Sequence, residues 1–422
     1  MRKWLAKLLC SALLICQFVG ATGQGSGSLQ LDDFLCGMFV GGRWGTTQNN
    51  LASIPGSYFD YLRSINASWV GISVSMTVED SMDPSVEICG PNEDFQTFSN
   101  DELRSLIRGL KENGFHVYVT LAFEHMGDGP EGKRVHRWQL GDPAIYKEDA
   151  RVWREFWPWD PAHQDHEWFV REFFSSYTEL AVRYAQLCQE EGVELFSLGT
   201  ETDRLFHTRR IPASYWSTEF RDELSGMVQS VKAVYDGLVT YDMLSSALGQ
   251  SFFGYLDYLW DDCGFDAIGI SAYFQLTGPD ARDGLPSEED ELLSVWRSVF
   301  REKLEPLALA NPHLPVLFLE FGYTDCVEST YQIDCMQFEK RHFTDQNGNG
   351  LDDGEEQQAA AYSAMFQAVR EFPGVLDGVF CHGDMVASDE DWSSSFGLLR
   401  CFSVRDKLAE EVVRSNFASL GQ

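Results

Sequence analysis

Short apolar runs alternate with amphipathic segments along most of the chain. Runs of this length, rich in Leu, Val and Phe, are typical of parallel strands that are buried on both faces. The segments between them carry apolar residues at helical spacing, most clearly from Trp168 to Glu191. Eight strands are predicted, at 36–41, 68–77, 116–123, 194–201, 238–244, 265–273, 315–320 and 375–380.

Helices are predicted between and after these strands, at 58–65, 100–113, 168–191, 220–235, near Tyr255, and at 291–304, 357–372 and 406–419. Eight strands that alternate with helices fit a (β/α)8 barrel better than an open doubly wound sheet. No glycine-rich phosphate loop opens any of the helices, which weakens a nucleotide-binding interpretation. We therefore expect an α/β fold, a single TIM barrel over residues 34–420 with enlarged loops after strands three and seven.

The first 23 residues have the pattern of a secretory signal peptide. Three cations, Arg2, Lys3 and Lys7, precede an apolar run at 8–19, and small residues follow. This run is shorter than the roughly 20 residues that span a bilayer. We expect cleavage after residue 23, a flexible leader at 24–33, and a monomeric protein that is secreted or periplasmic and does not attach to a membrane.

The chain is strongly acidic, with a formal net charge of -33 that becomes -36 without the three cations of the signal. Such a charge argues against nucleic acid and anionic membranes as partners. A neutral polymer is easier to reconcile with it. The acidity could equally serve solubility.

Eight cysteines follow the signal segment: Cys36, Cys89, Cys188, Cys263, Cys326, Cys335, Cys381 and Cys401. An even number in an exported chain permits disulfides. The closest pairs, Cys326 with Cys335 and Cys381 with Cys401, are the first candidates. No spacing of cysteine and histidine resembles a zinc site, so we expect these thiols to be structural.

Two predicted strands end on a glutamate, Glu201 in ELFSLGTETD and Glu320 in PVLFLEFGYTD. Either one alone could simply mark where the chain reaches water. In a barrel, however, strands four and seven end at the same face, so the two side chains would converge. Cleavage of a glycosidic bond requires one carboxylic acid to protonate the leaving oxygen and a second carboxylate to attack or to activate water. The pair therefore predicts a glycosidase site.

Other strand-end and aromatic residues are candidates for substrate binding. Tyr273 ends strand six and could donate a hydrogen bond to the nucleophile, or could be a structural aromatic residue. Sugars stack on aromatic rings, and tryptophans are concentrated between 138 and 168, where Trp168 has the spacing of a core residue. The full set of candidates is Tyr273, Trp138, Trp157, Trp159, Trp392, Arg43, His125 and Asp203. The last three could equally form surface ion pairs.

Four segments resemble glycoside hydrolase family 113, a β-mannanase family of the clan A hydrolases. They are YAQLCQEEGVELFSLGTE, VKAVYDGLVTYD, FDAIGISAYFQL and PVLFLEFGYTD, and they occur in the family's order. The resemblance covers about residues 37–417. It implies that Glu201 is the acid/base and Glu320 the nucleophile of a retaining reaction, with a β-linked polysaccharide, most consistently β-mannan, as substrate.

Two departures from the clan pattern concern the substrate more than the reaction. Most clan members have asparagine directly before the acid/base. Here Thr200 takes that position, as threonine does in the GTE variant of the family. Strand eight reads VFCHGDM and lacks the usual tryptophan, so Trp392 is a candidate for the floor of the sugar site. The alternatives are a glycosidase for galactan, xylan or β-glucan, a carbohydrate-binding barrel without catalysis, and a secreted metal-dependent hydrolase.

A separate motif, DQNGNGLDDGEE, has the spacing of a calcium-binding EF-hand loop. Its turn position is a glycine, Gly350, and no organic cofactor is indicated. The alternative is a glycine-rich acidic surface loop. The calcium ligands expected are Asp345, Asn347, Asn349, the carbonyl of Leu351, Asp353 and Glu356.

Overall fold

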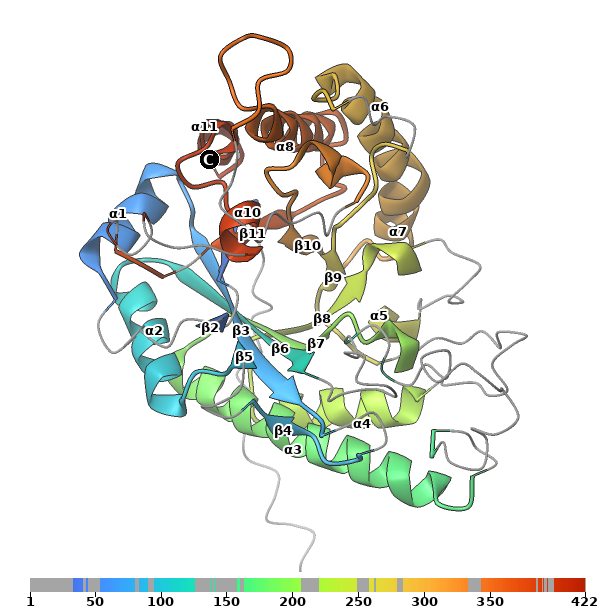
Figure 1. The fold of residues 1–422 in the computed structure, drawn as a ribbon. Helices are drawn as coiled ribbons and strands as arrows, with labels where there is room; N and C mark the ends of the chain where they lie inside the picture. Colours follow the sequence, from blue (N-terminus) through green and yellow to red (C-terminus); the bar gives the residue numbers. More distant parts are fainter. Residues whose placement is uncertain are drawn as a thin grey trace, which may run out of the picture. The chain divides into compact units, whose positions relative to one another are not determined.

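Eight parallel strands form a closed barrel at the centre of the computed structural model (Figure 1). Each strand pairs with the next in chain order, and β1 pairs with both β11 and β3. An open doubly wound sheet would have two free edges, which this closure removes. The predicted TIM barrel is therefore confirmed. Its strands are β1 (Leu35–Val40), β3 (Trp69–Thr77), β6 (His116–His125), β7 (Leu195–Thr200), β8 (Leu238–Leu244), β9 (Ile268–Ser271), β10 (Val316–Phe321) and β11 (Gly378–Asp384).

Three two-residue strands lie outside the ring. β4 (Glu87–Ile88) is antiparallel to β3, and β2 (Arg43–Trp44) pairs with β5 (Phe95–Gln96). The structure describes residues 33–40, 43–44, 54–79, 83–89, 95–125, 137, 140, 158–159, 163–205, 220–248, 258–261, 263–278, 284–332, 343–384, 386–388, 390, 393 and 398–421.

Helices surround the strands (Figure 1). A π-helical segment, Phe300–Leu304, joins α6 to α7, and α8 begins four residues earlier than predicted. Within the described residues, no helix combines the length and the apolar composition needed to cross a bilayer. The helices are α1 (Gly56–Ser64), α2 (Asn100–Glu112), α3 (His166–Glu191), α4 (Arg221–Lys232), α5 (Tyr258–Asp261), α6 (Glu289–Val299), α7 (Glu305–Ala310), α8 (Asp353–Glu371), α10 (Leu398–Phe402) and α11 (Leu408–Leu420).

Two apolar clusters make the core, because each barrel strand buries both faces. The larger cluster lies between strands and helices, and the smaller one fills the barrel. Inside the barrel, the ring of Phe380 lies so close to Gly37 that a Cβ there would come within 2.3 Å of it. A side chain at position 37 would therefore displace Phe380, which explains why β1 carries glycine at this point.

The predicted disulfide between Cys381 and Cys401 is wrong. Cys381 is a free thiol in β11 and is fully buried, in the apolar layer that also contains Cys36. Burial raises the pKa of Cys381 well above its ordinary value, so it remains a neutral thiol. The pairing of Cys326 with Cys335 stays a prediction, because Cys335 lies outside the described residues.

Candidate active site

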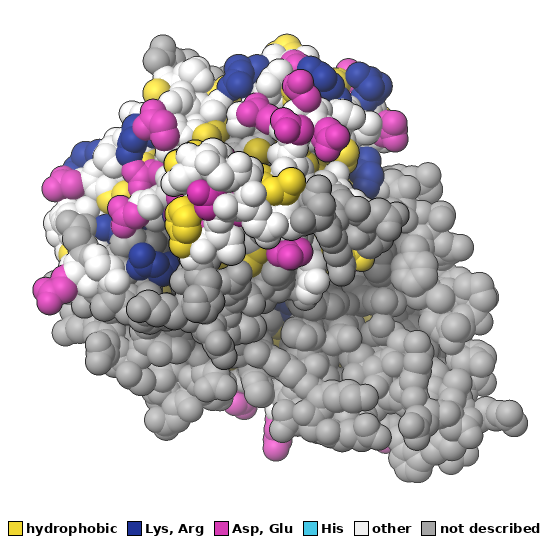
Figure 2. Space-filling view, turned by 45° about the horizontal axis from the view of Figure 1, so that its top comes forward, with side chains coloured by type: hydrophobic (Ala, Val, Ile, Leu, Met, Phe, Trp, Pro, Cys, Tyr) yellow, Lys and Arg dark blue, Asp and Glu magenta, His cyan; other side chains and the backbone are white. Residues whose placement is uncertain are grey.

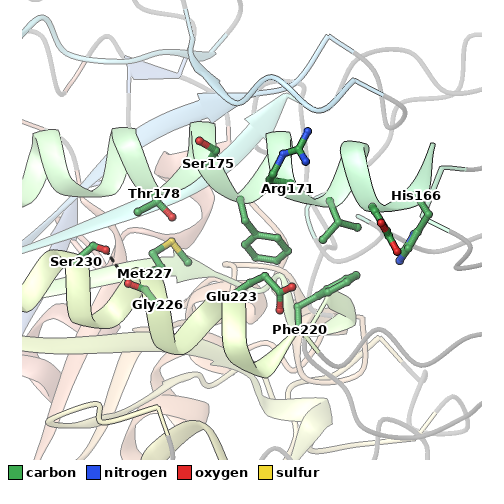
Figure 3. A pocket seen from close by; sticks show the side chains of 12 residues that line it. His166, Arg171, Ser175, Thr178, Phe220, Glu223, Gly226, Met227 and Ser230 are labelled. Carbon is green, nitrogen blue, oxygen red and sulfur yellow. Dashed lines mark hydrogen bonds between the residues drawn. The ribbon is translucent and has the colours of Figure 1, made fainter.

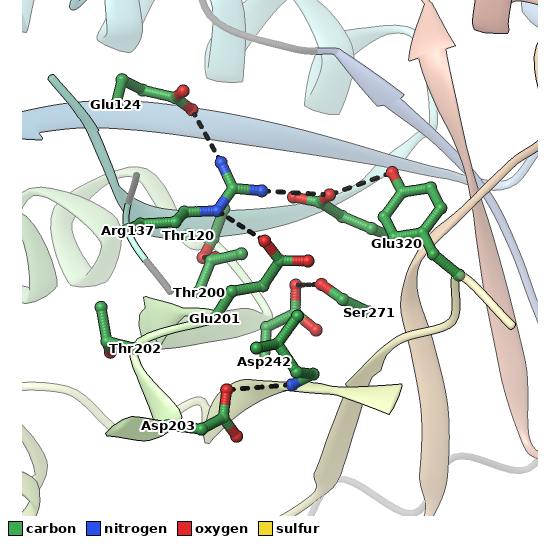
Figure 4. Close-up of polar contacts among 12 residues, drawn as sticks. Thr120, Glu124, Arg137, Thr200, Glu201, Thr202, Asp203, Asp242, Ser271 and Glu320 are labelled. Carbon is green, nitrogen blue, oxygen red and sulfur yellow. Dashed lines mark hydrogen bonds and ion pairs between the residues drawn. The ribbon is translucent and has the colours of Figure 1, made fainter. Parts of the chain in front are cut away.

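The two predicted catalytic glutamates lie at the same end of the barrel (Figure 4). Glu201 directly follows β7, the fourth barrel strand, and Glu320 is the penultimate residue of β10, the seventh. Only 4% of Glu201 and 3% of Glu320 is exposed. The carboxyl ends of parallel strands meet at one face of a barrel, which is why two residues 119 positions apart share one site.

One guanidinium group joins the pair. Arg137 Nε donates to Glu201 Oε2 at 2.9 Å, and Nη2 lies 3.5 Å from Glu320 Oε2. Its third nitrogen lies 3.5 Å from Glu124 Oε1, at the end of β6. Burial by itself lowers the pKa of Arg137, but the three carboxylates raise it well above its ordinary value. Arg137 therefore remains a cation in the centre of the site.

The two glutamates have different electrostatic surroundings. Burial raises the pKa of Glu201, Arg137 lowers it, and the negative charge of Glu320 raises it further. Burial also raises the pKa of Glu320, and the pKa stays above its ordinary value although Arg137 and a hydrogen bond from Tyr273 lower it. Tyr273 Oη donates to Glu320 Oε2 at 3.1 Å, which is the hydrogen bond expected from the sequence. Glu201 is thus the better proton carrier, and Glu320 the better held anion.

The backbone of Glu201 is strained. Its φ is 57°, in the left-handed region that non-glycine residues seldom occupy. The neighbouring strand holds this conformation, because Glu201 N donates to the carbonyl of Asp242 at 2.8 Å. Before it, Thr200 Oγ1 shares a hydrogen bond of 2.9 Å with Thr120. The strand therefore ends in a fixed turn that aims the Glu201 side chain, as expected where geometry serves a site.

A fourth carboxyl group, Asp242 of β8, lies beneath the two glutamates and is fully buried. Its Oδ2 accepts a hydrogen bond from Ser271 Oγ at 3.0 Å (Figure 4). Burial raises the pKa of Asp242 well above its ordinary value, and the charges of Glu320 and Glu201 raise it further. Asp242 therefore takes up a proton more readily than an exposed aspartate does, and it adds little negative charge to the site.

His382 lies in β11, the eighth barrel strand, two residues before the strand ends at Asp384. Its ring stacks on Phe39 with centroids 5.5 Å apart and lies edge-on to Tyr273. Nδ1 is 3.8 Å from Glu320 Oε2. Burial, assisted by the charge of Arg137, lowers the pKa of His382 to about 3, so the contact joins a neutral imidazole to the carboxylate and is not an ion pair.

Two predicted substrate-binding residues are fully buried. Trp159 is fully buried and packs edge-on against Phe169 and Phe173, with centroids 4.8 and 4.9 Å away, so it belongs to the core and cannot stack on a sugar. Asp203 is also fully buried, and its Oδ2 accepts from Leu244 N at 3.1 Å. Burial raises the pKa of Asp203 to about 8. Trp159 is therefore a core residue, contrary to its predicted role, whereas the role of Asp203 in substrate binding stays a prediction.

The remaining candidates are not settled by the structure. Arg43 lies in β2 and His125 ends β6, but their side chains are outside the described part of the chain. Trp138, Trp157 and Trp392 lie outside the described residues altogether. Their roles in sugar binding stay predictions.

Sequence reasoning missed three residues of this site. Arg137 had no signal, because it lies in a stretch without periodicity that also contains Arg134. Asp242 had one, since it is the one carboxylate within the strand LVTYDML. His382 stands in the strand-eight segment VFCHGDM, but nothing in the sequence indicated its contact with the nucleophile.

A separate hollow of about 660 Å³ lies between α3 and α4 in the helical layer (Figure 3). Its lining includes His166, Arg171 and Glu223. None of the predicted catalytic or substrate-binding residues lines it. We therefore place the active site at the strand ends.

A closed (β/α)8 barrel with two buried glutamates at the ends of strands four and seven is an arrangement typical of barrel glycoside hydrolases. The chain belongs to glycoside hydrolase family 113, whose model matches residues 142–381, more than half of the 422 residues. It is therefore a glycoside hydrolase, and its substrate is a polysaccharide or an oligosaccharide.

Solved structures show the same fold at low sequence identity. A family 113 β-mannanase from Alicyclobacillus acidocaldarius in complex with ManMIm is 20% identical, with a TM-score of 0.60; the match covers 92% of this chain and 99% of that one. A family 113 β-1,4-mannanase complex is 16% identical at a TM-score of 0.59, with the same coverage. An endo-1,4-β-D-mannanase from Thermotoga petrophila is 11% identical at 0.51, again with that coverage. No curated protein sequence matches the chain.

Proposed function

We propose that the protein is a secreted β-mannanase that cleaves its polysaccharide with retention of configuration, through Glu201 as acid/base and Glu320 as nucleophile. The observation that carries the proposal is the unequal pair of glutamates around Arg137. The mannanases of similar fold support β-mannan as the substrate. The proposed export signal is the segment that precedes residue 24.

In the first step, a carboxylate oxygen of Glu320 attacks the anomeric carbon while Glu201 gives its proton to the glycosidic oxygen. The bond from the anomeric carbon to that oxygen breaks, and a glycosyl ester forms on Glu320. Tyr273, which donates to Glu320 Oε2, holds the attacking carboxylate in position. In the second step, Glu201 removes a proton from water, which attacks the ester and frees the sugar and Glu320.

The electrostatics of the site favour this change of role. The negative charge of Glu320 raises the pKa of Glu201 before reaction. Formation of the ester removes that charge, so the pKa of Glu201 falls and the group becomes a base when water must be activated.

The test compares wild type with Glu201→Gln and Glu320→Gln on β-mannan, glucomannan, galactan, xylan and β-glucan. We expect reducing ends from β-mannan, and a loss of at least about 10³-fold in kcat for both variants, because each group acts in the transition state. An aryl β-mannoside with a good leaving group separates the roles, since it needs no protonation. Glu201→Gln should still form the glycosyl enzyme from it, whereas Glu320→Gln should not.

Four results would contradict the proposal. Activity that survives both substitutions would remove the catalytic pair. Cleavage of another β-glycan alone would change the substrate, and binding without cleavage would make the barrel a carbohydrate-binding protein. An inverted anomer in the first product, observed by NMR, would exclude the glycosyl ester.

A further inference from the structure

Residues 345–356 form an oxygen-rich loop that leads into α8 and ends in the first turn of that helix. Among the described residues, no contact joins this loop to Glu201 or Glu320. Asp345 Oδ2 accepts from Gly350 N at 3.0 Å. Gly350 has a φ of 86°, so this turn requires glycine. The loop therefore closes between its first and sixth positions, as a calcium-binding EF-hand loop does.

The twelfth residue faces the third and the fifth. Asn347 Nδ2 and Asn349 Nδ2 donate to the two oxygens of Glu356 at 2.8 and 2.6 Å. Each asparagine oxygen accepts one backbone N–H, from Asn349 and from Leu351, and keeps a second lone pair. A cation between Glu356 and the two asparagines could therefore replace the amide contacts without unfolding the loop.

Asp353, at the ninth position, supplies an independent observation. It is fully buried, and its Oδ2 accepts from Gln346 N within the loop at 2.8 Å. Its Oδ1 is buried and makes no hydrogen bond with any described residue, and the same holds for Asp345 Oδ1. A buried carboxylate oxygen without a donor is costly, and a cation is the partner that would offset this cost.

The composition of the donors indicates the kind of cation. Within the described residues, no group of three or more histidine, cysteine, aspartate and glutamate side chains is arranged to hold a metal. A cation in this loop must therefore also use asparagine and main-chain oxygens. Six or more oxygen ligands in a flexible loop suit calcium, whereas magnesium requires a smaller and more rigid octahedron.

We propose that residues 345–356 bind one calcium ion through Asp345, Asn347, Asn349, the carbonyl of Leu351, Asp353 and Glu356. The three carboxylates carry one negative charge more than the ion neutralises, and they would move toward it as it binds, since they are not grouped around one point in this structure. The role of the ion is structural.

The ion would fix the start of α8 and, through it, the segment that follows β10. The side chain of Gln358, in the second turn of α8, is fully buried and donates to the carbonyl of Tyr323 at 2.8 Å. Tyr323 lies three residues after Glu320, and its hydroxyl donates to the carbonyl of Phe274 at 2.7 Å. Calcium in the loop would thus stabilise the connections that carry both Glu320 and Tyr273.

The test is a calorimetric titration of the full-length protein. A chelator first removes bound metal, and CaCl2 or MgCl2 is then added. We expect one calcium ion per chain with a Kd below about 1 mM, and magnesium binding at least about tenfold weaker. Glu356→Gln should weaken calcium binding by about tenfold or more, because the last ligand of such loops is bidentate. Hydrogen exchange at residues 321–325 and 353–358 should slow when calcium is added.

The matched control is Glu291→Gln, which removes one negative charge from the exposed start of α6 and should bind calcium as wild type does. Asn349→Ala removes one proposed calcium ligand outside α8. It tests the site if Glu356→Gln does not fold. Absence of binding at several millimolar calcium, or equal binding by wild type, Glu356→Gln and Asn349→Ala, would overturn the proposal. None of these measurements needs substrate, so their failure would leave the proposed function untouched.

Discussion

Arg137 links the ionisation of both catalytic glutamates, since its single guanidinium group contacts each of them. Its positive charge lowers the pKa of Glu201 and of Glu320 against the effect of their burial. The protonation of acid and nucleophile is therefore linked through a third residue, which neither strand contains.

Replacing Arg137 by Met should move the pH optimum of kcat/KM upward. Without the cation, the pKa of Glu320 rises, so the nucleophile ionises at higher pH and the acidic limb moves up. The pKa of Glu201 rises as well, so the acid keeps its proton to higher pH and the basic limb moves in the same direction. The measurement is kcat/KM against pH on β-mannan.

Arg137→Lys is the control, because it keeps the charge and should leave the optimum near that of wild type at a lower rate. A profile of Arg137→Met that moves to lower pH, or does not move, would show that Arg137 does not set these two pKa values.

At the scale of elements, two described tryptophans, Trp159 before α3 and Trp168 in its first turn, divide between core and surface. Trp159 contacts Phe169 and Phe173 of α3, and also Phe220 just before α4. Trp168 lies one position before Phe169 and is 50% exposed. One residue along a helix turns the side chain by about 100°, which places Trp168 outside the buried stripe. Its expected core role is therefore wrong.

Trp159→Ala should reduce the free energy of unfolding by about 3–5 kcal/mol, because it leaves a large cavity among three phenylalanines. Trp168→Ala, in the same stretch of chain, should change it by less than about 1 kcal/mol. Denaturant unfolding measures both. An unchanged stability of Trp159→Ala together with a raised KM would restore Trp159 as a sugar-binding residue.

At the scale of the whole molecule, the acidic surplus is not segregated on the face drawn in Figure 2. Acidic and basic side chains of the described residues are interspersed there. Ion pairs such as Arg297 with Glu371 are of this kind. Such mixing of charges favours solubility.

Export is the prediction that concerns the chain as a whole. A protein produced with its first 23 residues in a secreting host should appear outside the cytoplasm and begin after residue 23, which mass spectrometry of its amino terminus would show. Leu13→Arg should block export, because a charge in the apolar run opposes insertion. Leu13→Val keeps the run apolar and is the control. Export of Leu13→Arg at the level of wild type would contradict a signal peptide.

The sequence by itself determined the eight strands, most of the helices and the two glutamates at strand ends. These features depend on local periodicity, which reflects the burial of each strand on both faces and of each helix on one. The barrel rule then placed Glu201 and Glu320 at one face without any coordinates. The EF-hand spacing of residues 345–356 was likewise a local pattern.

Only the tertiary structure decided which side chains meet. Periodicity tells which face a residue occupies but not what lies opposite, so it could not bring Arg137 to both glutamates or His382 to Glu320. It could not distinguish a tryptophan in the core from one in water when both follow the same strand, nor show that Cys381 points into the apolar layer. The left-handed backbone of Glu201 also depends on β8, a neighbour about 40 residues away, because the strain is held by a hydrogen bond between strands.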